Sequence, residues 1–97
     1  LTVESSITAD EYVFFPFQGR AGQRVIVVVR SSGGSTLDPV AAVIGPDGTI
    51  VGEGDDSSGT LDVYFEMTLP DDGTYQLRVN GYLSAGDFRA TVIAVYQ

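Results

Sequence analysis

The sequence contains no cysteine, histidine, lysine or tryptophan among its 97 residues. Without cysteine, the chain has neither a disulfide nor a thiolate metal site. Without histidine, it lacks the usual general base of enzymes and the commonest ligand of transition metals, which excludes Ser-His-Asp triads, Cys-His dyads and most zinc sites. Few classes of enzyme remain, and we expect the chain to be non-catalytic.

The charge and the apolar runs exclude two further classes. Thirteen acidic residues against five arginines give a net charge of -8. The arginines are scattered along the chain, so we expect no nucleic-acid partner, because phosphate binding needs a basic stripe. The longest apolar runs have five residues, for example residues 25–29, against the roughly 20 that a membrane helix requires. We therefore expect no membrane span.

The length of 97 residues suits a single domain, residues 1–97, with one hydrophobic core. The chain begins at Leu1, and no basic segment precedes an apolar stretch. We therefore expect a mature or excised domain.

Apolar residues recur with a period of two, which is typical of half-buried β-strands. The clearest strands are residues 61–69, 74–82 and 87–96, whose predicted core-facing residues are Val63, Phe65, Met67 and Leu69, then Tyr75, Leu77 and Val79, then Phe88, Ala90, Val92 and Ala94. Further β-rich runs are residues 3–7, 11–17, 24–30, 38–45 and 49–53. Seven or eight strands without a helix predict an all-β fold, an antiparallel two-sheet β-sandwich.

Proline and glycine positions refine this prediction. Pro16 lies inside an aromatic run and has no backbone N–H, so its strand is predicted to lie at a sheet edge or to bulge. Residues 46–49 (PDGT) and 70–74 (PDDGT) each separate two strands. Both are predicted to be hairpin turns, because proline presets φ, aspartate bonds its own backbone and glycine accepts positive φ.

Several motifs occur in an order that resembles the bacterial pre-peptidase C-terminal domain family. They are residues 10–14 (DEYVF), 21–25 (AGQRV), 37–40 (LDPV), 45–48 (GPDG), 55–56 (DD), 69–75 (LPDDGTY) and 86–88 (GDF), the last with Phe88 where the family usually has tyrosine. The resemblance implies a jelly-roll-like sandwich without catalytic activity, exported and extracellular, that serves in attachment, solubility or processing. It also implies calcium near the N-terminal segment in some relatives.

Acidic residues supply candidate calcium ligands, although no cofactor is required by the sequence. The resemblance points to Glu4, Asp10 and Glu11, and the densest acidic cluster adds Glu53, Asp55, Asp56 and Asp62. Calcium prefers six to eight oxygen ligands, and these spacings do not fit an EF-hand loop. The alternative is a solvated acidic loop. A catalytic pair is disfavoured, since adjacent carboxylates on a strand point to opposite faces.

Some strands are apolar on both faces, whereas a sandwich needs only one apolar face per strand. With Val25, Val27 and Val29 in the core, and with Tyr12 and Phe14 also inward, the residues predicted to point outward are Val13, Phe15, Phe17, Ile26, Val28, Ile93 and Val95. Either loops and edges cover them within the monomer, or they form a protein-protein contact.

The leading hypothesis is a non-catalytic extracellular module that contacts a protein: a matrix or parent protein, or other copies of itself. One alternative is the structural subunit of an extracellular filament or surface layer, joined by edge pairing or strand exchange. Another is a calcium-dependent substrate-binding accessory domain of a secreted hydrolase.

Overall fold

The computed structural model describes residues 1–8, 11–32, 37–54, 62–82 and 84–95. The strands in these ranges are β1 (Thr2–Ile7), β2 (Tyr12–Gly19), β3 (Arg24–Ser31), β4 (Pro39–Ile44), β5 (Ile50–Gly54), β6 (Val63–Thr68), β7 (Gly73–Gly81) and β8 (Gly86–Val95). No helix occurs in these ranges, and so none is present there that is long and apolar enough to cross a membrane.

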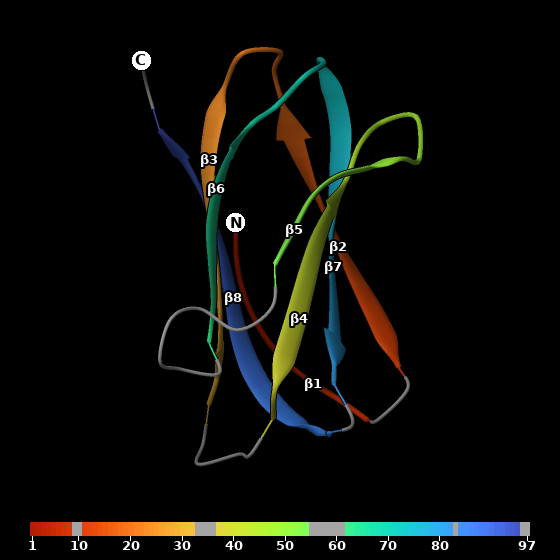
Figure 1. The fold of residues 1–97 in the computed structure, drawn as a ribbon, viewed down its shortest axis with the longest axis vertical. Helices are drawn as coiled ribbons and strands as arrows, with labels where there is room; N and C mark the ends of the chain where they lie inside the picture. Colours follow the sequence, from red (N-terminus) through yellow and green to blue (C-terminus); the bar gives the residue numbers. More distant parts are fainter. Residues whose placement is uncertain (9–10, 33–36, 55–61, 83, 96–97) are drawn as a thin grey trace.

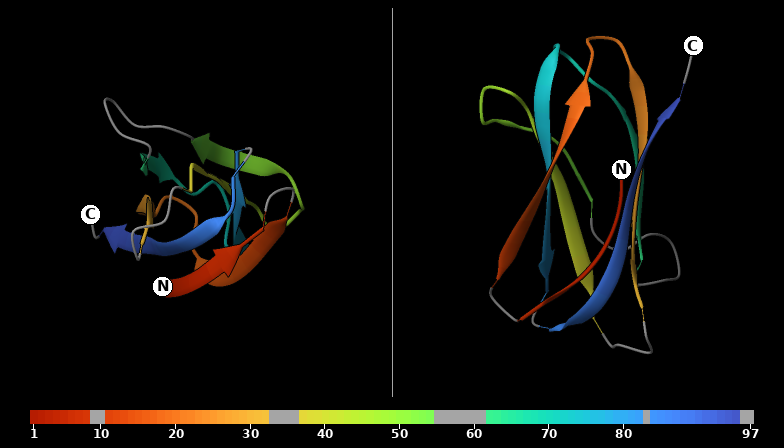
Figure 2. Two further views of the ribbon diagram at one scale, coloured as in Figure 1. Left: turned by 90° about the horizontal axis from the view of Figure 1, so that it is seen from below. Right: turned by 180° about the vertical axis from the view of Figure 1, so that it is seen from behind.

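The strands form two antiparallel sheets that pack face to face as a jelly-roll sandwich (Figure 1). Sheet A has the order β1-β8-β3-β6, and sheet B has the order β2-β7-β4-β5. The right-hand view of Figure 2 separates the two layers, with β8 and β1 in one and β2, β7 and β4 in the other. The predicted fold class is confirmed, and β2, which contains Pro16, lies at the edge of sheet B as predicted.

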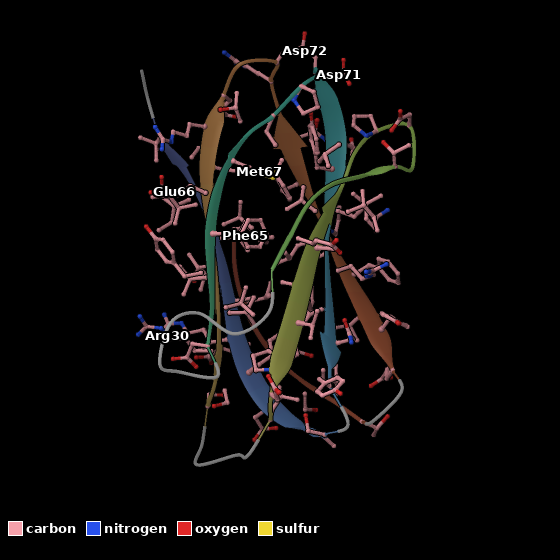
Figure 3. All side chains as sticks on the ribbon, in the orientation of Figure 1. Arg30, Phe65, Glu66, Met67, Asp71 and Asp72 are labelled. Atoms are coloured by element: carbon pink, nitrogen blue, oxygen red, sulfur yellow. The ribbon has the colours of Figure 1, made fainter. Side chains whose placement is uncertain are left out.

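The core lies between the sheets and is built by the inward side of each strand. Its buried side chains are Ile7, Val25, Val27, Val29, Leu37, Ala41, Val43, Val63, Leu69, Tyr75, Leu77, Val79, Phe88, Ala90 and Val92. Figure 3 shows Phe65 and Met67 directed inward from β6, while Glu66 between them points outward. The alternation predicted for β6 and β7 is confirmed. In β8 the predicted alternation stops before the end of the strand. Ala94 was predicted to face the core but is exposed, and it lies beyond Thr91, the last residue of β8 that pairs with β1.

The two proline-glycine segments, residues 46–49 and 70–74, make different connections. Residues 46–49 form the turn of the β4–β5 hairpin, as predicted. The amide of Gly45 donates a hydrogen bond to the carbonyl of Thr49 (2.7 Å), and the amide of Gly48 donates one to the carbonyl of Gly45 (2.9 Å). Gly48 has a φ of 87°, which favours glycine. The Oδ1 atom of Asp47 accepts hydrogen bonds from the amide and hydroxyl of Thr49 (3.1 and 2.7 Å), and the hydroxyl bond is the main reason why the pKa of Asp47 is lowered.

Residues 70–74 are not a hairpin turn, and that prediction is wrong. They carry the chain from β6 in sheet A to β7 in sheet B, at one end of the sandwich, where Figure 3 labels Asp71 and Asp72. The Tyr75 hydroxyl donates to the carbonyl of Asp71 (2.6 Å) and accepts from its amide (3.0 Å). The Asp72 carboxylate accepts from the amide of Ala21 (2.8 Å). The backbone of Asp71 and the side chain of Asp72 therefore stabilise the connection between the two sheets.

Candidate interaction surface

The outer side of sheet A carries a continuous apolar stripe, which we call face A. Cross-strand register places Ile26 opposite Ile93, and Val28 between Thr91 and Tyr64. Tyr64 is 53% exposed and Ile93 47% exposed. Face A consists of Ile26 and Val28 of β3, Tyr64 of β6, and Thr91, Ile93 and Val95 of β8. Its side chains alternate with buried core residues on the same strands, so the stripe follows from the two-residue period of β-structure.

Three ion pairs surround face A. Arg24 contacts Glu66 at 2.6 Å, and the pairs Arg30–Asp62 and Arg89–Glu4 are each at 3.9 Å. Figure 3 shows Arg30 and Glu66 projecting from this side of the sandwich. Three of the five arginines, although scattered in the sequence, thus gather in space, and each of these three is paired with an acid. Exposed pairs of this kind add little stability, and here they limit the net charge around the apolar stripe.

The Arg24–Glu66 pair also sets the titration of its neighbours. The hydrogen bond from Arg24 is the main reason why the pKa of Glu66 lies below its ordinary value, and the hydrogen bond from Tyr64 adds to this effect. The Tyr64 hydroxyl donates to Glu66 (3.1 Å), and this bond to a carboxylate raises the pKa of Tyr64. At neutral pH this corner of face A therefore holds a neutral tyrosine beside a charged pair.

Four of the residues predicted as an interaction surface lie together on face A: Ile26, Val28, Ile93 and Val95. The orientation predicted for the other three was wrong, because Val13, Phe15 and Phe17 pack against the core. Phe15 meets Phe88 edge to face at 6.1 Å, and Phe17 stacks on Tyr75 at 5.7 Å.

The same reversal exposes residues on sheet B that were predicted to point inward. Tyr12 is 55% exposed and Phe14 is 49% exposed. Ile50 of β5, which was not singled out, is also 49% exposed. Residues 12–17 are apolar at every position, so alternation gives no signal for the direction of β2. The register with β7 decides it, since residues 13, 15 and 17 lie opposite buried Val79, Leu77 and Tyr75.

The predicted calcium ligands do not gather where the structure describes them. Glu4 pairs with Arg89 and Asp62 with Arg30, and the Glu11 carboxylate accepts from the amide of Thr8 (3.0 Å). Glu53 lies on sheet B, away from the sheet that carries Glu4. Asp10, Asp55 and Asp56 lie outside the described residues. Within the described ranges no three acidic side chains form a metal group, so these residues alone do not fit calcium and the site stays a prediction.

Fold and surface together define a small jelly-roll β-sandwich with apolar side chains exposed on the outer sides of both sheets. The bacterial pre-peptidase C-terminal domain family matches residues 11–81. The chain belongs to this family, which confirms the resemblance carried by the ordered motifs. No curated protein sequence matches it.

Solved structures share the fold at low sequence identity. The pre-peptidase C-terminal domain of collagenase from Bacillus anthracis has a TM-score of 0.75 and 15% identity, over 96% of this chain and 88% of that one. PliG proteins, periplasmic inhibitors of g-type lysozyme from several bacteria, are also similar. The Salmonella Typhimurium protein has a TM-score of 0.68 and 20% identity, over 97% and 89% of the two chains. The Aeromonas hydrophila protein has 0.66 and 17%, over 96% and 85%.

Proposed function

We propose that this chain is an exported, non-catalytic module that binds another protein through face A. The observation that carries the proposal is the stripe of β-branched and aromatic side chains that crosses three strands of sheet A without a covering element in the described structure. Contiguous exposed apolar surface with a polar rim is typical of protein-protein contacts.

The family and its structural neighbours support the export and the binding role. The family is a bacterial pre-peptidase C-terminal domain, and the PliG proteins of the same fold are periplasmic and inhibit a protein, g-type lysozyme. The sequence has no histidine or cysteine. Glu4, Asp62 and Glu66 are each paired with an arginine, which leaves these three acids unsuited to proton transfer.

The energetics suit a moderate interface. Complete burial of a large apolar side chain contributes about 1.5–3 kcal/mol. Ile93 and Tyr64 are each about half exposed, so each is expected to contribute about 1 kcal/mol on docking. The net charge of -8 favours a partner of opposite net charge and weakens self-contact at low ionic strength.

Site-specific photo-cross-linking at Ile93 against bacterial extracytoplasmic proteins tests this proposal, and the same label at Ile50 is the control. Both isoleucines are about equally exposed, at 47% and 49%, but they lie on opposite sheets. For a partner recovered through position 93, we expect I93E to weaken binding at least tenfold while I50E leaves the affinity unchanged. Equal effects of both variants, or loss only in I50E, would remove face A from the proposal.

A second candidate is the filament or surface-layer subunit, favoured by exposed apolar residues on both sheets. Two different contact surfaces on opposite sides permit head-to-tail association, which extends when the rotation does not close a ring. Because the chain is strongly acidic, added salt should promote this association. Light scattering at low and high salt tests the candidate, and a strict monomer at high protein concentration under both conditions excludes it.

A further inference from the structure

Arg78 of β7 differs from the arginines around face A. Its side chain points to the outer side of sheet B, and its guanidinium carbon lies 5.1 Å from the centre of the Tyr12 ring. Its Nε atom is buried and makes no hydrogen bond within the described residues. Arg24, Arg30 and Arg89 each have an acid within 4 Å, whereas Arg78 is held by an aromatic face instead.

The cross-strand neighbours of Arg78 are apolar, whereas Gln76 and Asn80 flank it along β7. The register places Phe14 of β2 on one side of it and Ala42 of β4 on the other. We call the surrounding surface face B, which comprises Tyr12, Phe14, Val40, Ala42, Ile44 and Ile50 together with Arg78. Tyr12 and Phe14 are each about half exposed, so the arginine lies beside two aromatic side chains of β2 that remain open to a partner.

The acid in the same cross-strand row is too far away to neutralise Arg78. Glu53 of β5 lies opposite Ala42, which in turn lies opposite Arg78. Two strand spacings of about 4.8 Å separate the backbones of Glu53 and Arg78, and no ion pair joins the two residues. The guanidinium leans toward Tyr12, on the side away from Glu53. Its charge is therefore available to an external acceptor.

We propose that face B docks a protein segment that presents one carboxylate between apolar side chains. The carboxylate would accept hydrogen bonds from the terminal nitrogens of Arg78, and its apolar neighbours would pack on Tyr12 and Phe14. A guanidinium forms two parallel, charge-assisted bonds to a carboxylate. Its contact with Tyr12 already restricts the side chain, which reduces the entropy lost on binding.

The remainder of the chain sharpens the choice of partner. With a net charge of -8, the domain repels strongly acidic partners as a whole. A single carboxylate in apolar surroundings avoids that repulsion and still complements Arg78. This contact uses the sheet opposite face A, so it does not depend on the function proposed for face A.

A peptide-display selection against the intact chain, followed by binding measurements, tests the inference. The library presents random ten-residue peptides, and binders are counter-selected on Arg78→Met, which keeps an unbranched apolar stem beside Tyr12. We expect selected peptides to place Asp or Glu between apolar residues. Changing that acid to its amide, or using R78M, should weaken binding at least tenfold. R78K should weaken it less, because the charge remains but the fork is lost.

Several results would overturn the inference. These are a selection that yields no binders, binders without an enriched acid, or binders whose affinity is the same for wild type and R78M. Self-association that R78M abolishes would assign face B to a second copy instead of a partner segment. The thermal midpoint of R78M must match wild type, which excludes unfolding as the cause of lost binding. I93E should leave peptide binding unchanged, so failure at face A and failure at face B are distinguishable.

Discussion

The hydroxyl of Tyr75 offers a direct test of how the two sheets are joined. The ring of Tyr75 is completely buried, and its hydroxyl both donates to and accepts from the backbone of Asp71 in the crossing between β6 and β7. A tyrosine that bonds the backbone a few residues upstream at such a corner is a known device of Greek-key sandwiches. Tyr75→Phe removes both bonds and keeps the ring.

The expected loss can be calculated from these contacts. Each hydrogen bond contributes about 1 kcal/mol net. Asp71 is exposed, so water can replace part of the lost bonding, and the full desolvation penalty does not apply. The total is about 2 kcal/mol. A chain of 97 residues has an unfolding entropy of about 0.2 kcal/mol/K, so the thermal midpoint should fall by about 10 °C.

Thermal unfolding followed by circular dichroism measures this change. Tyr64→Phe is the matched control, because the Tyr64 hydroxyl bonds only an exposed carboxylate in the described structure, and its loss should change stability by less than about 0.5 kcal/mol. Hydrogen exchange at the Asp71 amide should accelerate in Y75F alone. A midpoint within 2 °C of wild type, roughly 0.4 kcal/mol by the same conversion, would refute the role of this hydroxyl.

Three further predictions concern the ion pair, the packing and the metal. Arg24→Gln should raise the pKa of Glu66 toward its ordinary 4.5, as followed by carboxyl-carbon NMR; an unchanged pKa would contradict the assignment to Arg24. Because the pKa of Glu66 is lowered in the folded state, its pair with Arg24 stabilises the native state at pH values above the ordinary pKa. This stabilisation is lost as the pH falls through the folded-state pKa of Glu66. Wild type should therefore lose more stability than R24Q on acidification. Gly19→Ala should cost about 1–3 kcal/mol in denaturant unfolding, because its Cβ would overlap Leu69 and lie 2.9 Å from the Tyr75 ring; unchanged stability would mean that these side chains yield freely. Calcium titration with thermal unfolding decides between a metal site and a solvated acidic loop, since a ligand bound only by the native state raises the midpoint, and no shift at millimolar calcium removes the metal.

The predicted strands were most reliable where one face of the strand is polar. In β6 and β7 the alternation identifies the buried set, which includes Val63, Leu77 and Val79. The reason is physical, since a period of two assigns alternate residues to opposite faces and only one face enters the core. In β2 both faces are apolar, so the predicted direction rested on no alternation and was wrong. The register with β7 decided it, which turns Phe15 and Phe17 toward the core.

The candidate surface was predictable in its parts but not as a whole. The alternation in β3 and β8 predicted that Ile26 and Ile93 point outward, but only the pairing of these distant strands makes them neighbours. The Arg24–Glu66 bond joins residues 42 positions apart, which no local pattern reveals. Arg78 likewise reads as an ordinary polar position in an alternating strand until Tyr12 is found against it.

By itself, the sequence determined the strand content, the two-layer architecture, the family and the lack of histidine and cysteine chemistry, because all of these follow from local pattern and composition. The tertiary structure decided which sheet each strand joins. Residues 70–74 show the difference: their composition predicts a turn, but whether a turn returns to the same sheet or crosses to the other depends on which strands pair. That pairing is a non-local property, and it determines which side chains reach the surface together.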